Sequence, residues 1–340
     1  MSTGTTKLDV VVSDVVPVND LVTRFHFRRR DGQLLPTFSG GAHVVVEMRD
    51  GELLPTFSGG AHVVVEMRDG DRTRLNPYSL MGSPLDTREY TISVRRDDVG
   101  RGGSLFMHRS VKPGLEMVIS YPVNLFSLDL RAKKHLMLAG GIGITPFMAQ
   151  LHDLRAGNVP YELHYATRSP EYGAYCELLS GNEPTAVSLY HDCNKHFIDI
   201  EGLLGDQPLG THVYVCGPAG MITRVLDTAH ALGWPDSHVH YEKFAAPPTG
   251  DAFDATLLRS GIDVHVLPDQ SLLEAIEAAG VDAPYLCRGG VCGFCRTEVV
   301  AVDGELIHND HFLSDEEKAS GKVIMPCVSR ARCRKLVLNL

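Results

Sequence analysis

The sequence has no long hydrophobic run. No apolar stretch approaches the roughly 20 residues that a membrane-spanning helix needs. The first residues, MSTGTTKLDVVVSD, also lack the basic region followed by an apolar stretch that marks a secretory signal. We therefore predict a cytoplasmic protein that does not enter a membrane.

Basic residues are also in short supply. Lysine and arginine number 32, against 42 aspartates and glutamates, so that the formal net charge is −10. Because nucleic-acid binding depends on clustered positive charge, this balance argues against a nucleic-acid partner. An acidic surface can instead attract a basic protein over a long range, or simply keep the protein soluble.

Cysteines are present, but not in the pattern of a zinc site. Eight cysteines in a chain without a secretory signal favour metal or redox chemistry over disulfides. Zinc sites usually show paired C-x2-C units, and only one such pair occurs. In YLCRGGVCGFC, Cys287, Cys292 and Cys295 follow the C-x4-C-x2-C spacing, and Cys327 follows after 31 intervening residues. This is the plant-type [2Fe–2S] arrangement, so we predict these four thiolates as cluster ligands.

The chain is too long for one ordinary core, because domains usually have roughly 100–200 residues. Short runs that alternate apolar and polar residues predict an antiparallel barrel or sandwich at the start. Apolar runs that alternate with helical stretches then predict a parallel sheet with helices on its faces. We place the boundaries at 1–130 for the barrel, 131–244 for the α/β domain, 245–252 for a linker rich in Pro and Gly, and 253–340 for a small last domain.

One segment of the first domain is written twice. Residues 31–49 and 50–68 differ only in Gln33 against Glu52. A solenoid needs at least about three units, so we interpret the pair as a tandem duplication within one domain. A short Asp-Gly turn joins the second copy to the next strand and predicts a hairpin. We therefore expect the second copy to form the barrel strand and the first to be surplus, and a duplication without any function stays equally open.

A glycine-rich turn lies between a strand and a helix of the second domain, although it is not a G-x-G-x-x-G fingerprint. The segment AGGIGITPF contains Gly140, Gly141 and Gly143, with Thr145 as an expected N-cap and Pro146 in the first helical turn. The free amides and positive dipole of that helix end suit a pyrophosphate. A tight turn without a ligand is the alternative.

A second turn supports the nucleotide interpretation. In VYVCGPAGM, Cys216, Gly217 and Pro218 stand at the carboxyl end of another strand. Ligands of open parallel sheets bind at the carboxyl ends of the strands, where both turns would meet. Together the two turns predict a dinucleotide site.

The first domain contains a possible flavin motif. The segment RLNPYSLMGSP, from Arg74 to Pro84, combines an arginine for a phosphate, a tyrosine ring for stacking and a serine hydroxyl for the flavin N5 edge. An ordinary strand end is the simpler interpretation of these residue types alone. In GRGGSLFMH, the amide of Gly103 and the hydroxyl of Ser104 also suit a phosphate at a helix start.

The order YSL, GGIGITP, CGP and CRGGVCGFC with a late cysteine resembles the phthalate dioxygenase reductase family over nearly the whole chain. The resemblance implies an FMN-binding barrel, an NADH-binding α/β domain and a plant-type ferredoxin domain of the α+β β-grasp fold. By position it assigns Tyr78, Ser79 and Leu80 to the flavin, residues 140–146 with Cys216, Gly217 and Pro218 to the nicotinamide nucleotide, and Phe244 to the other flavin face.

There is one departure from the family pattern. The family's arginine stands two residues before the tyrosine, where this chain has Asn76, and Arg74 stands four before it. Alternate strand residues share a face, so Arg74 would point the same way but lie about 6.6 Å further along the strand. Pro77 also interrupts the strand. Arg74 is our candidate for the phosphate.

The resemblance implies an NADH-dependent flavin iron–sulfur oxidoreductase that passes electrons from NADH through FMN to the cluster, and then to a Rieske-type oxygenase or demethylase. Two alternatives stay open. One is a stand-alone NADH-dependent reductase without a dedicated oxygenase, and the other is a ferredoxin-type electron carrier whose flavin domain does not function.

Overall fold

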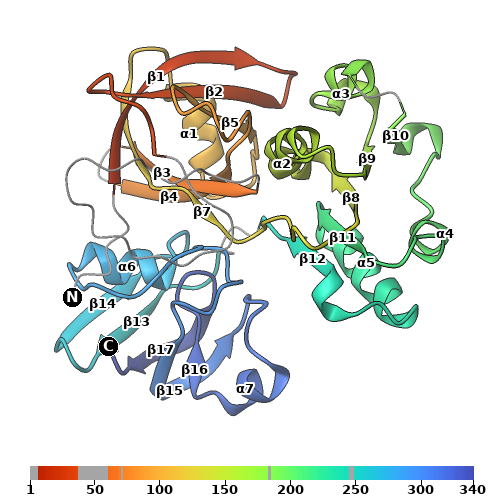
Figure 1. Cartoon of the computed structure of the whole chain (residues 1–340). Coiled ribbons are helices and arrows are strands. Elements are labelled where there is room, and N and C mark those ends of the chain that lie inside the picture. Colours follow the sequence, from red (N-terminus) through yellow and green to blue (C-terminus); the bar gives the residue numbers. More distant parts are fainter. Residues whose placement is uncertain (1–6, 37–59, 70–71, 183–184, 245–248) are drawn as a thin grey trace.

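The computed structural model describes residues 7–36, 60–69, 72–182, 185–244 and 249–340. Three β-sheets follow one another along the chain, and each belongs to its own domain (Figure 1). The predicted fold class, an antiparallel flavin-type barrel followed by a parallel-sheet domain and a ferredoxin domain, is confirmed. Among the described residues, no helix is long and apolar enough to cross a lipid bilayer.

The first domain is a nearly closed antiparallel barrel. Its strands are β1 (Lys7–Pro17), β2 (Val22–Arg29), β3 (Ala61–Asp69), β4 (Arg72–Ser79), β5 (Tyr90–Arg95), β6 (Glu116–Ser120) and β7 (Val123–Asn124). They lie in the order β4-β3-β6-β1-β2-β5, with β7 beside β3. A bridge between Met81 and Thr91 connects the ends of this order. Leu8, Val10 and Val12 are buried on alternate positions of β1, as a strand with one face toward a core requires.

The duplicated segment is divided between two places in the barrel. The second copy forms β3, which pairs with β4 across the short turn, as expected. The first copy is not wholly surplus, however, and that expectation is wrong for its first residues. Leu35 is fully buried and its amide donates to the Thr87 carbonyl at 2.7 Å, while the Tyr90 hydroxyl donates to the Pro36 carbonyl. The rest of the first copy and the start of the second, residues 37–59, lie outside the described residues.

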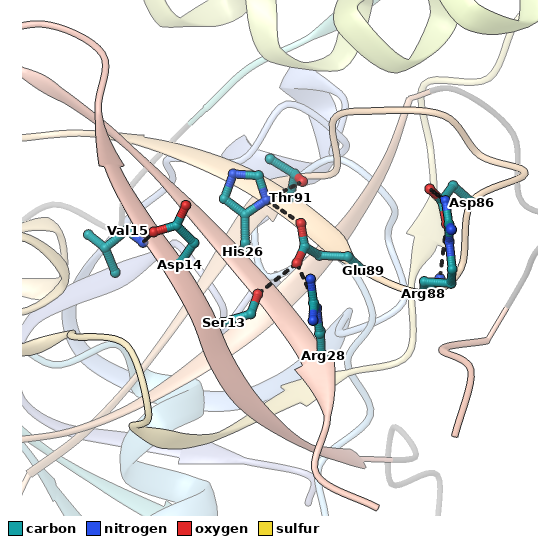
Figure 2. Close-up of polar contacts among 9 residues, drawn as sticks. All are labelled: Ser13, Asp14, Val15, His26, Arg28, Asp86, Arg88, Glu89 and Thr91. Carbon is teal, nitrogen blue, oxygen red and sulfur yellow. Dashed lines mark hydrogen bonds and ion pairs between the residues drawn. The ribbon is translucent and has the colours of Figure 1, made fainter. Parts of the chain in front are cut away.

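On the barrel surface, Glu89 directly precedes β5 and connects β1 with β2 through a polar network (Figure 2). Its carboxylate accepts hydrogen bonds from Ser13 at 2.7 Å and Arg28 at 2.9 Å, and contacts His26 Nδ1 at 2.5 Å. Burial raises the pKa of Glu89, but these partners outweigh it and lower the pKa overall. The Ser13 hydroxyl donates to Glu89 and not to His26. These residues therefore stabilise the packing of neighbouring strands, and do not form a pair of a serine nucleophile and a histidine base.

The second domain is a parallel sheet of strands β8 (Lys134–Gly140), β9 (Tyr161–Thr167), β10 (Val187–His191), β11 (Thr211–Cys216) and β12 (Val239–Glu242), in the order β10-β9-β8-β11-β12. Its α-helices are α2 (Thr145–Ala156), α3 (Cys176–Asn182), α4 (Ile200–Gly205) and α5 (Ala219–Ala231). Helices α2 and α3 cover one face and α4 and α5 the other. Because both faces are covered, β11 is buried along its whole length.

The third domain has strands β13 (Phe253–Leu257), β14 (Ile262–Val266), β15 (Thr297–Ile307), β16 (Val323–Ile324) and β17 (Arg330–Leu338), with helices α6 (Leu272–Ala278) and α7 (Asp315–Ser320). The order is β14-β13-β17-β15-β16. A capping box of Ser271 and Glu274 starts α6. Helix α6 lies on the side of this domain that faces the barrel (Figure 1). Of the expected linker 245–252, residues 245–248 lie outside the described residues.

Candidate cofactor site

The three domains meet at one cavity of about 260 Å³. The barrel contributes the ends of β3, β4 and β5 and the turn before helix α1 (Gly103–Ser110). The nucleotide domain contributes the turn after β8 and the end of β12, and the ferredoxin domain contributes the start of α6 and the cysteine loop. Residues from each predicted cofactor site therefore face a common space.

On the barrel wall, two buried polar atoms lack a hydrogen-bond partner among the described residues. They are the Ser79 hydroxyl and His62 Nε2. The two residues lie directly opposite each other on β3 and β4, so both side chains point to the same face. Leaving buried polar groups unpaired is costly, and native structures usually satisfy them. A ligand with a polar edge, such as a flavin ring, fits this wall.

Tyr78 stands beside them and lines the same cavity. Its hydroxyl accepts a hydrogen bond from Asn76 Nδ2 at 3.3 Å, and burial raises the pKa of the phenol to about 12. The ring therefore stays neutral and can stack. Leu80, which the YSL motif assigned to the flavin, is instead buried in the barrel core, and its amide donates to the Ala61 carbonyl at 2.7 Å.

The phosphate candidates lie at the N-terminus of α1. Gly103 and Ser104 line the cavity, and Gly102, with φ of 91°, takes the left-handed conformation that glycine allows. Arg74 does not line this cavity. Its Nε donates to the Arg101 carbonyl at 2.7 Å, and it faces a neighbouring cavity of about 500 Å³ between the barrel and the ferredoxin domain. Arg74 thus bonds to the turn that precedes α1.

The two nucleotide turns pack against each other. A Cβ atom on Gly143 would lie 2.3 Å from the Cys216 carbonyl oxygen, so only glycine fits there. Of the first turn, Ile142 and Thr145 reach the cavity. The expectation that Thr145 is the N-cap is wrong. A 3-10 turn at Gly141–Ile144 precedes α2, whose N-cap is Ile144, and the Thr145 hydroxyl donates to the Ile142 carbonyl at 3.0 Å.

The other predicted nucleotide residues lie around these turns and do not line the cavity. They are Gly140, Gly141, Pro146, Cys216, Gly217 and Pro218. Phe244 lies at the cavity wall with 49% of its side chain exposed, where a ring can cover a ligand.

Glu242 was not predicted, and it is the cavity's most perturbed acid. It ends β12 opposite Cys216 in the strand register, and its Oε2 is buried without a partner among the described residues. Burial raises the pKa of Glu242 to about 8. Burial and the neighbouring Glu242 also raise the pKa of the Cys216 thiol. Both groups therefore favour their uncharged forms near neutral pH.

The cysteine loop closes the far end. Cys287 and Cys327 line the cavity, and the sulfur atoms of Cys295 and Cys327 are 3.3 Å apart. The Gly289 amide donates to the Cys287 sulfur at 3.3 Å. Contact with the Cys292 thiol, then that of Cys327, and the amides of the loop lower the pKa of Cys287. Thiols that gather in this way, with amides directed at sulfur, fit an iron–sulfur cluster.

In a [2Fe–2S] cluster four thiolates hold two irons, so four cysteines are enough for it. All eight cysteines are free of disulfides.

A flavin-type barrel, a nucleotide sheet and a ferredoxin domain around one cavity define a flavin-dependent iron–sulfur reductase, and comparison with known proteins agrees. Residues 255–332 match the family of 2Fe-2S iron–sulfur cluster binding domains, and residues 118–239 match the N-terminal domain of DmmA-like dimethylamine monooxygenase subunits. A carnitine monooxygenase reductase subunit of Acinetobacter baumannii is 42% identical over 332 residues, covering 97% of each chain.

Two further relatives also match over nearly the whole chain. The β subunit of a heme-dependent oxidative N-demethylase from Ectopseudomonas mendocina is 44% identical, covering 98% of this chain and 99% of the relative. The solved structure of phthalate dioxygenase reductase, described as modular for electron transfer from pyridine nucleotides to [2Fe–2S], has a TM-score of 0.84 at 32% identity and covers 98% of both chains.

The chain belongs to the phthalate dioxygenase reductase family. It is an oxidoreductase, the reductase component of a multicomponent oxygenase or demethylase, and its cofactors are FMN, NADH and a [2Fe–2S] cluster. The predicted family, general function and cofactors are confirmed.

Proposed function

We propose that this chain carries electrons from NADH to a Rieske-type oxygenase, and that its predicted site residues act along the single cavity described above. The observation that carries this proposal is that Ser79, at the flavin wall, and the cluster cysteines Cys287 and Cys327 line the same cavity. Electrons that arrive at the flavin wall would then have a short route to the cluster end.

Each wall has its own task. The Ser79 hydroxyl and His62 Nε2 would hydrogen-bond the polar edge of the flavin, and the turn at Gly103 and Ser104 would hold its phosphate. When bound, FMN supplies the exchange between a two-electron hydride and single electrons, a reaction that side chains alone do not provide. Thr145 would position the nicotinamide. Phe244 would cover the second face of the flavin ring and exclude water from it.

Around the cysteine loop, the surface suits an outside protein. Phe294 and Phe312 are each 47% exposed, and the Phe312 ring packs on Gly293 within the loop. Helix α7 begins nearby with the exposed acids Asp315 and Glu316. Exposed aromatic rings with charge at the rim are typical of protein interfaces, and the acids would attract a partner with a basic face.

The direction of electron flow also favours a Rieske centre. Plant-type clusters have potentials near about −400 mV, and Rieske centres lie at roughly −150 mV or above, so transfer to one runs downhill. We place this reaction in the cytoplasm, where cysteines stay reduced and can serve as cluster ligands.

A heme-containing oxygenase is the second candidate partner. The relative from Ectopseudomonas mendocina is named as a subunit of a heme-dependent oxidative N-demethylase. Partner choice depends on surface side chains, and the cavity does not distinguish the two.

The test is an anaerobic NADH titration of the purified chain, followed by visible absorbance. We expect flavin and iron–sulfur bands that bleach together. Iron–sulfur bands without flavin would support the electron-carrier alternative. For the partner, the tagged chain is used to capture its oxygenase, whose spectrum shows either a Rieske centre or a heme Soret band; capture of neither would favour the stand-alone reductase.

A further inference from the structure

Arg101 belongs to the barrel by sequence, but its side chain binds the ferredoxin domain. It lies in the turn between β5 and α1, next to the glycines expected to hold the flavin phosphate. Its Nε donates to the Asp269 carbonyl at 2.7 Å, and its Nη2 forms an ion pair with Glu274. The side chains of Arg101 and Glu274 are only 12% and 9% exposed. The contact is therefore a buried ion pair between two domains.

Glu274 connects this pair to helix α6. Its Oε2 accepts a hydrogen bond from the Ser271 amide at 2.7 Å, and its own amide donates to the Ser271 hydroxyl at 3.1 Å. These two bonds are the capping box that fixes the first turn of α6. Arg101 thus contacts the capped end of the helix, where a shift of the barrel turn would be passed on to the first turn of α6.

The first turn of α6 is in turn bonded to a cluster ligand segment. The Leu273 amide donates to the Pro326 carbonyl at 3.0 Å, and the next residue is the predicted ligand Cys327. On the barrel side, the Arg101 carbonyl accepts from Arg74 Nε at 2.7 Å. Hydrogen bonds and the backbone between them therefore connect β4 and the turn before α1, through Arg101 and α6, to the segment that carries Cys327.

A buried ion pair is costly to break, because removing one partner leaves the other charge buried and uncompensated. Interfaces between domains of one chain are otherwise comparatively weak, and relative domain motion is the ordinary expectation. The pair Arg101–Glu274 therefore opposes such motion at the place where the flavin wall meets the cluster domain.

We propose that Arg101 is a positioning residue for electron transfer from the flavin to the cluster, because it fixes the phosphate turn of the barrel against α6. This inference rests on the flavin placement given under Proposed function. It assigns to Arg101 no contact with the reacting atoms. Its loss should therefore slow the step between the cofactors more than the step from NADH to flavin.

The experiment is anaerobic stopped-flow mixing of the full-length holoprotein with NADH, with flavin and cluster reduction followed at separate wavelengths. In Arg101→Gln we expect the ratio of the cluster rate to the flavin rate to fall by about tenfold or more, which corresponds to about 1.4 kcal/mol of activation free energy. Glu274→Gln should lower the ratio too, because glutamine keeps the capping box but loses the charge. Arg101→Lys keeps the positive charge, so its ratio of the cluster rate to the flavin rate should lie between those of Arg101→Gln and the wild type.

The matched control is Arg332→Gln, which removes an exposed ion pair with Glu305 within the ferredoxin domain, 66% and 62% exposed. In this variant the rates of flavin reduction and of cluster reduction should both stay at the wild-type values. Hydrogen exchange without NADH provides a second readout. In Arg101→Gln, the amides of the first turn of α6 should exchange faster, while those of β1 should not change.

An unchanged ratio in Arg101→Gln with unchanged exchange in α6 would overturn the inference. So would a parallel fall of both rates with loss of flavin, since that would make Arg101 a flavin ligand. Failure of the wild-type protein to reduce its flavin with NADH would contradict the proposed function instead, and is seen before any variant is made.

Discussion

The two ends of the cofactor cavity are built in different ways. The cluster end comes from one domain, with three of its four cysteines in a single loop. The flavin end is assembled from β3, β4, β5 and the turn before α1, and the other domains close it. An iron–sulfur cluster is bound by four sulfur atoms, and the sequence spacing of the cysteines places most of them. A flavin is held by many weak hydrogen bonds, which come from several elements. A single substitution should therefore abolish binding of the cluster, whereas a single substitution at the flavin end should only weaken binding of FMN.

The largest effect is expected for Cys295→Ser. We expect loss of the cluster and a less stable ferredoxin domain, because ligand binding contributes to its folding free energy, with reduction of the flavin by NADH retained. Iron content and thermal unfolding measure the first two effects. Cys333→Ser is the control, since Cys333 lies outside the ligand set. A cluster that persists in Cys295→Ser would contradict the ligand assignment.

At the flavin end, Ser79→Ala should weaken FMN binding by about tenfold, the effect of one hydrogen bond worth about 1–1.5 kcal/mol. Titration of the flavin-free protein with FMN, followed by FMN fluorescence, gives the dissociation constant. Cluster absorbance should not change. Ser83→Ala, in the turn after β4, serves as the control. Equal affinities of wild type and Ser79→Ala would show that the buried hydroxyl does not bind the flavin.

A smaller, pH-dependent effect is expected for Glu242→Gln. Burial raises the pKa of folded Glu242 from 4.5 to about 8, so its contribution to stability is full below pH 4.5 and is lost as the pH rises toward 8. Glutamine has no proton to lose. The unfolding temperature of the wild type should therefore fall between pH 5 and 8 relative to that of Glu242→Gln. The rate of flavin reduction by NADH should decrease above about pH 8 in the wild type only. Parallel pH profiles would disprove the raised pKa.

The smallest effect is expected for deletion of residues 31–49. The barrel uses Leu35 and Pro36 of the first copy, but Leu54 and Pro55 of the second copy take the same place in the deleted chain. FMN affinity and NADH-dependent flavin reduction should stay unchanged or improve, because a spare apolar run is removed. Loss of folding on deletion would reveal a structural task for the repeat.

The cluster end could be predicted from the sequence because its information is local. The cysteine spacing is itself the geometry that the cluster requires, and the capping box of α6 is likewise written within four residues. The three domain types followed from the change in hydrophobic period along the chain.

The flavin end could be predicted only in part. Tyr78 and Ser79 were found through a motif, but His62, Arg95 and Glu242 enter the cavity by strand pairing and domain packing. The only sequence signal for Glu242 was its place two residues before Phe244 at a strand end. The sequence predicts Thr145 as the N-cap of α2, because the residues of the 3-10 turn before this helix cannot be distinguished from a loop by their pattern. The pair Arg101–Glu274 joins residues 173 positions apart, which no local pattern reveals.

The division of the repeat also has a consequence for how the insertion can be removed. Because the two copies differ only in Gln33 against Glu52, deleting any 19 consecutive residues that start between positions 31 and 50 leaves the same sequence, with one of these two residues in it. Since the barrel takes its first residues from one copy and its strand from the other, each of these deletions supplies both parts of the barrel.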